Sequence, residues 1–193
     1  MNETTKALDR RRRLGQLQYL RGRGIDIGAG LDPLVTPYGT VDVFDKAQGN
    51  AQFMSEVPDN SYDFVYSSHC LEHLKEVEYT LYSWTRILRP GGTLLIIVPD
   101  YELYEHNCWP SQFNEEHLSS FSLTVSRYDV KRTNHYHIPS QIVPVLHTLG
   151  IENIVTTLED DFYDYTDVTA DQTLGVALAQ ISIIGHRHDS RIS

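Results

Sequence analysis

The sequence predicts an α/β protein with a mostly parallel central sheet and flanking helices. Strand and helix patterns alternate from residue 24 to about residue 98, the order that parallel strands joined by crossover helices require. The run TLLIIVPD, residues 93–100, is apolar almost throughout and is typical of a strand buried on both faces of such a sheet. The chain has 193 residues, of which 40% are hydrophobic, so we expect one domain, 1–193.

Hydrophobic periodicity, glycine and proline predict the elements before residue 100. Residues 3–20 carry leucines at helical spacing and predict a helix in the amino-terminal segment 1–22. Residues 76–89 predict an amphipathic helix that ends at Pro90–Gly92. Three apolar or alternating runs predict strands: GRGIDI, GTVDVFD and Tyr62–Ser67.

The rest of the chain is less regular. Residues 101–137 are aromatic, polar and rich in histidine without a clean period, and we interpret them as a lid or an acceptor-site insertion. In the last segment, 138–193, residues 139–149 predict a helix, and IENIVTTLED and ALAQISIIGHR predict two closing strands.

The net charge and the spacing of the cysteines make some classes of function unexpected. The net charge of −10 makes a nucleic-acid partner unexpected, and we interpret the basic cluster Arg10–Arg13 as a solvated helix face. Cys70 and Cys108 lack metal-binding spacing, which fits a reducing compartment or two buried thiols. Without an apolar run of about 20 residues or the apolar core of a signal peptide, we expect a cytoplasmic protein that does not enter the membrane.

The glycine turn GIDIGAG indicates a ligand site after the first strand. Glycine lets the chain turn sharply and lets backbone N–H groups approach a ligand. A dinucleotide site requires a third glycine, but Leu31, Asp32 and Pro33 follow Gly30, and Asp32 would repel a pyrophosphate. A nicotinamide-dependent oxidoreductase is therefore disfavoured, and Asp26 on the strand suits a cationic ligand.

An acidic side chain at the end of the second predicted strand can accept both hydroxyls of a ribose. Asp45 stands at this place, and Asp42 is the alternative because strand ends are the least certain part of a prediction.

Four motifs in order resemble those of the class I S-adenosylmethionine-dependent methyltransferases. They are GIDIGAG, VDVFD, GNAQFMSEVPDNSYDFVYSSHCLEHL and ILRPGGTLLIIVPD. The resemblance covers Arg23 to about Asp100. It implies a Rossmann-like fold with an antiparallel carboxyl-terminal strand and a cofactor-binding half, 23–100. It also implies an enzyme that uses S-adenosylmethionine and releases S-adenosylhomocysteine.

The resemblance implies cofactor contacts by position. Gly28 and Gly30 would pass under the methionine part, and Asp26 would orient its ammonium group. Asp45 would hold the ribose, and Asn50 would contact the adenine amino group. The full set of expected cofactor-binding residues is Asp26, Gly28, Ala29, Gly30, Asp45, Asn50, Ala51, Ser68 and His69. The short, proline-containing connection after Gly30 predicts a reduced first helix, and the four residues between Asp45 and Asn50 leave no room for a second.

Methyl transfer needs alignment of donor and acceptor, and it needs a general base only if the acceptor must lose a proton. His117 is the expected base, because it follows Asn114 at helical spacing. Tyr104, Trp109 and Asn114 are expected in the acceptor pocket. The expected acceptor is an unidentified small molecule, a sugar or another hydroxyl or amine metabolite. A protein acceptor stays open, and the alternative function is a non-catalytic module that binds S-adenosylmethionine.

Histidine spacing raises the question of a metal. His69 and His73 stand four residues apart and could ligate one ion on a helix, but the sequence offers no convincing third ligand. His135 and His137 are interpreted as a surface pair. We therefore predict no metal site, and the oligomeric state is not assigned.

Overall fold

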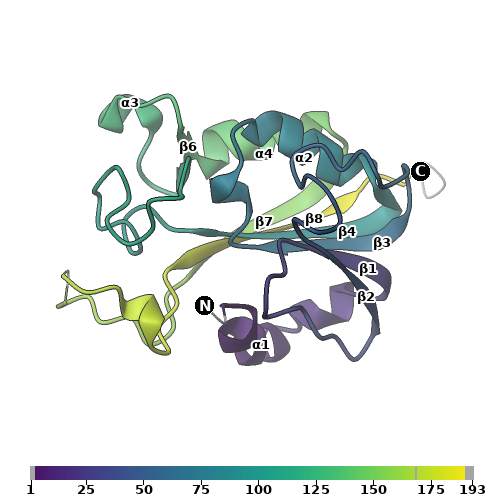
Figure 1. Cartoon of the computed structure of the whole chain (residues 1–193), viewed down its shortest axis with the longest axis horizontal. Helices are drawn as coiled ribbons and strands as arrows, with labels where there is room; N and C mark the ends of the chain where they lie inside the picture. Colours follow the sequence, from purple (N-terminus) through teal and green to yellow (C-terminus); the bar gives the residue numbers. More distant parts are fainter. Residues whose placement is uncertain (1–2, 168, 190–193) are drawn as a thin grey trace.

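The computed structural model describes residues 3–167 and 169–189, and a six-stranded sheet runs through its centre (Figure 1). The strand order is β2-β1-β3-β4-β8-β7, in which β8 is antiparallel to both of its neighbours and the other pairs are parallel. The predicted mostly parallel sheet with an antiparallel carboxyl-terminal strand is confirmed. The strands are β1 (Gly22–Ile27), β2 (Gly39–Phe44), β3 (Tyr62–Ser68), β4 (Leu88–Pro99), β7 (Ile151–Glu159) and β8 (Gln180–Arg187).

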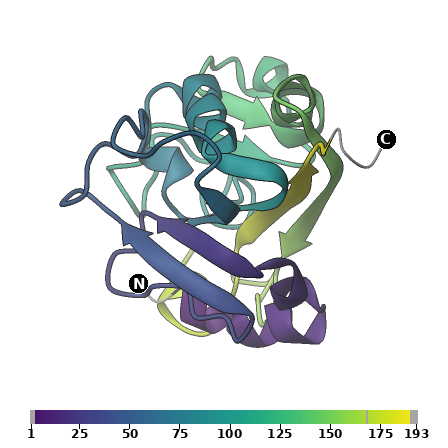
Figure 2. The ribbon, with the colours of Figure 1, turned by 90° about the vertical axis from the view of Figure 1, so that its right-hand side faces the viewer.

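Helices cover both faces of the sheet (Figure 2). On one face lie α2 (Val77–Arg86) and α4 (Val143–Thr148), and on the other lie α1 (Glu3–Arg13) and the short 3-10 helix η1 (Gln16–Tyr19). Because both faces are covered, the central strands bury side chains on both sides. This explains the unbroken apolar run in β4.

The alternation of side chains along a strand divides the core into two parts. In β4, Leu94, Ile96 and Val98 belong to the large cluster under α2 and α4. Leu95 and Ile97 point the other way and belong to the cluster that contains Leu17 of η1.

The amino-terminal helix is shorter than predicted. It ends at Arg13, because Gly15 adopts a left-handed conformation with φ of +67° before η1. The interpretation of Arg10–Arg13 as a solvated face is wrong for Arg10 and Arg11 but holds for Arg12 and Arg13, whose side chains are 63% and 64% exposed. Arg11 is 1% exposed and pairs with Glu159 at the end of β7, while Arg13 pairs with Asp161.

Two further element boundaries differ from the predictions. The helix predicted over 76–89 ends at Arg86, and Pro90–Gly92 lie inside β4. A Cβ at Gly92 would lie 2.8 Å from the carbonyl oxygen of Asp63, so glycine permits this close strand pairing. The helix predicted over 139–149 starts as a π-helical turn, η3 (Ile138–Ile142), and continues as α4.

The insertion 101–137 leaves the carboxyl end of β4 and contains a short parallel pair, β5 (Ser120–Ser122) with β6 (His135–His137). The surface-pair interpretation is wrong for His135, which is fully buried between Ser120 Oγ and the carbonyl of Val125. The remaining short helices are α3 (Arg127–Val130), η2 (Leu71–His73) and η4 (Gln172–Leu174).

The connections on the carboxyl side of β1 and β2 contain no helix, as the sequence predicts. The ligand edge of the sheet is therefore formed there by turns. Within the described residues, no helix has the length and apolar character needed to cross a membrane.

Candidate functional site

A cleft of about 690 Å³ lies at the carboxyl ends of β1, β2 and β3. Open α/β sheets bind ligands at this edge, and the volume suits a small organic molecule. Its lining residues are Gly28, Gly30, Asp45, Lys46, Gly49, Asn50, Ala51, His69, Cys70, His73, Leu74 and Glu116.

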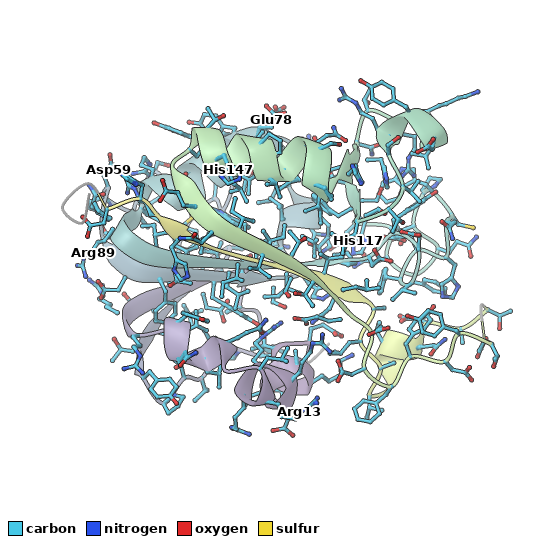
Figure 3. All side chains as sticks on the ribbon, turned by 180° about the vertical axis from the view of Figure 1, so that it is seen from behind. Arg13, Asp59, Glu78, Arg89, His117 and His147 are labelled. Atoms are coloured by element: carbon cyan, nitrogen blue, oxygen red, sulfur yellow. The ribbon has the colours of Figure 1, made fainter. Side chains whose placement is uncertain are left out.

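A larger hollow of about 970 Å³ lies at the opposite edge of the sheet, where Asn60, Asp63 and Arg89 form part of its wall. Figure 3 shows Arg89 at the end of the sheet opposite His117. This hollow is lined by residues of η1, the amino ends of β3 and β4 and the carboxyl end of β8, and it lacks the glycine turn. We therefore assign the smaller cleft as the candidate site, because position and chemistry agree there.

The glycine turn forms the floor of the cleft. Gly28 has φ of +78°, and its amide donates to the carbonyl of Phe44 at the end of β2. A Cβ at Gly28 would lie 2.6 Å from that of Cys70, so the turn packs directly on the loop after β3. Gly30 has φ of +55°, and a Cβ there would meet nothing within 4 Å. The space above Gly30 is open to the cleft.

Asp45 connects the two turns at the ends of β1 and β2. One carboxylate oxygen accepts a hydrogen bond from the Gly30 amide at 3.1 Å, and the other accepts from the Lys46 amide at 2.7 Å. Asp42 instead pairs with Arg23 and accepts from the Tyr62 hydroxyl, away from the cleft. The geometry therefore favours Asp45 over Asp42 as the residue that faces a ligand.

The next loop is anchored to α2. The Nε1 of buried Trp84 donates to the carbonyl of Ala51 at 2.9 Å, and the side-chain oxygen of Asn50 accepts from the Gln52 amide at 2.9 Å. These bonds hold Asn50 and Ala51 at the cleft wall. Six of the nine residues expected to bind the cofactor border the cleft; Asp26, Ala29 and Ser68 do not.

Asp26 lies behind the glycine turn rather than in the cleft. It is 1% exposed and accepts a hydrogen bond from the Leu34 amide at 2.7 Å. Burial raises the pKa of Asp26 to about 7, and the nearby negative charges of Asp32 and Asp45 add to the rise. Its role in orienting an ammonium group stays a prediction.

The raised pKa of Asp26 predicts a pH-dependent stability. Between about pH 4, the ordinary pKa, and about pH 7, the folded chain holds this proton and the unfolded chain does not. The free energy of unfolding therefore falls as pH rises through this window. We expect Asp26→Asn to be more stable than the parent at pH 8, by up to about 4 kcal/mol, while the two are nearly equal at pH 4. Urea unfolding at both pH values measures the difference.

In the Asp26→Asn variant, the free energy of unfolding still depends on pH because of Asp100. Burial raises the pKa of Asp100 to about 7 as well, so its contribution has the same sign. If Asp26→Asn lost stability at pH 8, the Leu34 hydrogen bond would outweigh the burial of charge, and our account of Asp26 would be wrong.

The loop after β3 places a histidine and a thiol in the cleft wall. His69 adopts φ of +53°, and its Nε2 lies 2.8 Å from Gln180 Oε1. Burial opposes protonation of His69, but its contact with Glu72 prevails and raises the pKa of the imidazole. Burial raises the pKa of Cys70 to about 12, so this thiol stays protonated and is a poor nucleophile.

The insertion contributes Glu116 to the cleft wall, and the residues expected in the acceptor pocket lie elsewhere. Tyr104 is buried and packs against the rings of Phe113 and His117. Trp109 lies under the guanidinium of Arg132, 4.5 Å from the ring centre. The acceptor-pocket assignment of Tyr104, Trp109 and Asn114 stays a prediction.

His117 lies one layer behind the cleft wall. Its side chain is 2% exposed, its Nδ1 is 2.7 Å from Glu105 Oε1, and its ring packs edge-on against His73. His73 borders the cleft and His117 does not. The expected role of His117 as a general base stays a prediction.

The sequence analysis did not assign six of the twelve lining residues to the cofactor site, and it considered one of these six, His73, only as a metal ligand. Lys46, Cys70 and Leu74 are close neighbours in sequence of expected residues, so a wider window around each motif would have included them. Gly49, with φ of +149°, carries the signal of an isolated glycine before Asn50. Glu116 carried no local signal, because only the folding of the insertion brings it to the cleft.

The matching family model and several similar solved structures are described as methyltransferases. A family model described as a methyltransferase domain matches residues 2–134. An S-adenosylmethionine-dependent methyltransferase of Archaeoglobus fulgidus has 16% identity and a TM-score of 0.56, with 97% of this chain and 95% of that chain covered. One from Thermotoga maritima has 20% identity and a TM-score of 0.55, with 97% and 100% covered.

A third similar structure contains ligands. Phosphoethanolamine N-methyltransferase 2 of Haemonchus contortus, in complex with phosphomonomethylethanolamine and S-adenosylhomocysteine, has 13% identity and a TM-score of 0.54. The alignment covers 96% of this chain and 53% of that one. No curated protein matches the sequence.

Proposed function

Because the chain belongs to the methyltransferase domain family, we propose that it transfers a methyl group from S-adenosylmethionine to a small-molecule acceptor that carries a hydroxyl or an amine. The observation that carries this proposal is the composition of the cleft. A turn with two positive-φ glycines, a strand-end carboxylate and an anchored amide residue line one cavity at the ligand edge of the sheet.

The residues present fit that cofactor. Gly30 leaves open space next to the Asp45 carboxylate, so a ligand can approach the backbone there. Asp45 keeps lone pairs for ribose hydroxyls, and Asn50 keeps its side-chain NH₂ group and an oxygen lone pair for the adenine. When bound, S-adenosylmethionine supplies a methyl group on a positively charged sulfur. The negative charges of Asp45 and of Asp32, both near Asp26, suit a positively charged ligand.

A small acceptor is supported by the enclosure of the site. Glu116 from the insertion and His73 from η2 line the cleft together with the glycine turn, so segments far apart in the sequence bound it. The Haemonchus contortus enzyme, with the same fold, holds a small phosphorylated amine. In the proposed reaction this chain aligns the acceptor with the methyl donor and excludes water.

Calorimetry with S-adenosylhomocysteine tests the proposal through a matched pair of variants. Gly30 and Gly150 both have positive φ, and a Cβ at either position would meet nothing within 4 Å, but only Gly30 borders the cleft. We expect Gly30→Ala and Gly150→Ala to lower stability by similar amounts, roughly 1 kcal/mol each. Only Gly30→Ala should weaken S-adenosylhomocysteine binding, by about 10-fold or more, because its methyl group enters the ligand space.

Two results would count against the proposal. One is the absence of heat and of a thermal shift when folded wild-type protein meets S-adenosylhomocysteine. The other is equal affinity in Gly30→Ala and Gly150→Ala, which would move the ligand away from the glycine turn.

A further inference from the structure

Three side chains, one in the cleft wall and two behind it, bring potential metal ligands together. Glu72 and His73 belong to η2, and His117 comes from the insertion, 44 positions after His73 in the sequence. One ligand atom from each lies within 4.8 Å of the other two. The sequence analysis paired His73 with His69 and found no third ligand; the fold instead brings Glu72 and His117 to His73.

The hydrogen bonds of the two imidazoles determine where their protons lie. His73 Nδ1 is 3.0 Å from the carbonyl oxygen of Glu116, and His117 Nδ1 is 2.7 Å from a carboxylate oxygen of Glu105. Both partners only accept, so each ring donates from Nδ1. Nε2 is therefore the ring nitrogen left to bind a ligand, and the two Nε2 atoms lie 3.9 and 4.0 Å from Glu72 Oε1.

Glu72 is a fully buried carboxylate without a hydrogen bond from any described residue to either of its oxygens. Its nearest possible donor, His69 Nδ1, is 3.4 Å away. His69 pairs with Oε1, whereas Oε2 has no partner among the described residues, and a buried carboxylate is costly unless it is fully paired or coordinates a metal. Two imidazole lone pairs and this carboxylate face one another, and a cation at their centre would satisfy all three.

We propose that Glu72, His73 and His117 bind one divalent transition-metal ion at the cleft wall. Two histidines and a glutamate are the protein ligands of one class of catalytic zinc site, which keeps a further position open. Glu105 would orient His117 in the way that carboxylates hold metal-binding histidines. Bonds of about 2 Å require the three side chains to close by roughly 1 Å. His73 is 28% exposed, so the open position faces the cleft.

The role of the ion rests on the proposed function and narrows the acceptor to one with a hydroxyl group. A bound ion would polarise the acceptor hydroxyl at its open position, so that the hydroxyl proton would leave to solvent more readily. An oxygen electron pair then forms the bond to the methyl carbon as the carbon–sulfur bond breaks, and both electrons of that bond stay on sulfur. This assignment replaces the base role of His117, because the ion uses the Nε2 lone pair that a base needs.

Metal binding by the full chain without a histidine tag tests the proposal. Chelator-treated protein is titrated with Zn²⁺ alone, and bound zinc is counted after dialysis. We expect one ion per chain in the wild type and at least 100-fold weaker binding in His73→Ala and His117→Ala. Glu105→Gln should weaken binding by about 10- to 100-fold, the range for partners that orient ligands. The matched control is His147→Ala, an exposed histidine on α4 (Figure 3), which should bind as the wild type does.

Co²⁺ gives a readout that needs no variant. Wild-type protein with Co²⁺ should show the visible absorption of a low-coordinate site, and Zn²⁺ should abolish it. No zinc uptake and no Co²⁺ bands in the wild type would overturn the proposal, as would equal zinc affinity in folded His117→Ala and His147→Ala. S-adenosylhomocysteine binding is measured on the same metal-free protein. Its loss would refute the proposed function, and the zinc count decides the metal site independently.

Discussion

Replacement of Asp45 by alanine is expected to weaken S-adenosylhomocysteine binding by about 100-fold. The carboxylate borders the cleft and would accept two ribose hydroxyl hydrogen bonds, each worth roughly 1.5–3 kcal/mol for a charged acceptor. The low end for two such bonds, about 3 kcal/mol, corresponds to a change in affinity of somewhat more than 100-fold. Isothermal titration calorimetry measures it directly.

Asp42→Ala is the matched control. Asp42 lies on β2, three residues before Asp45, but pairs with Arg23 at an exposed position, so its loss should leave ligand affinity within about twofold. Asp45→Ala also removes the acceptor for the Gly30 amide, and Asp45→Asn separates the two effects because an amide oxygen can still accept that bond. If Asp42→Ala weakened binding more than Asp45→Ala, the ribose assignment would belong to Asp42.

The sheet could be predicted because the sequence pattern of each strand depends on residues that are neighbours in the chain. In β4 the continuous apolar run follows from burial on both faces, and in β1 the glycines mark the turn that follows the strand. Most of the cleft floor was predictable for the same reason, since Gly28, Gly30 and Asp45 stand at strand ends that a parallel sheet brings to one edge.

Contacts between distant segments were not predictable. The arginines of α1 read as a solvated face because nothing in their own helix indicates Glu159 and Asp161, about 150 residues later. The approach of His117 to Glu72 depends on how the insertion folds back over η2, and periodicity carries no information about that path. Such pairings decide which polar residues are buried, so the chemistry behind the cleft wall was the least predictable part of the site.

The buried ion pair between Arg11 and Glu159 predicts the largest change in stability. Both side chains are at most 1% exposed, and two guanidinium nitrogens lie 2.9 and 3.3 Å from the carboxylate oxygens. Arg11→Ala leaves the Glu159 charge buried without this partner, and removing one member of such a pair costs about 3–5 kcal/mol. For a chain of this size the melting temperature should fall by roughly 10 °C, measured by calorimetric unfolding.

Two further variants separate charge burial from the loss of an arginine as such. Arg12→Ala, one residue away, removes an exposed pair with Asp9 and should change stability by less than about 0.5 kcal/mol. The double variant Arg11→Met, Glu159→Gln removes both charges and keeps an acceptor for the Gln180 amide, so it should regain most of the lost stability. If the double variant were as unstable as Arg11→Ala, the packing of the arginine stem rather than its charge would hold α1 against the ends of β7 and β8.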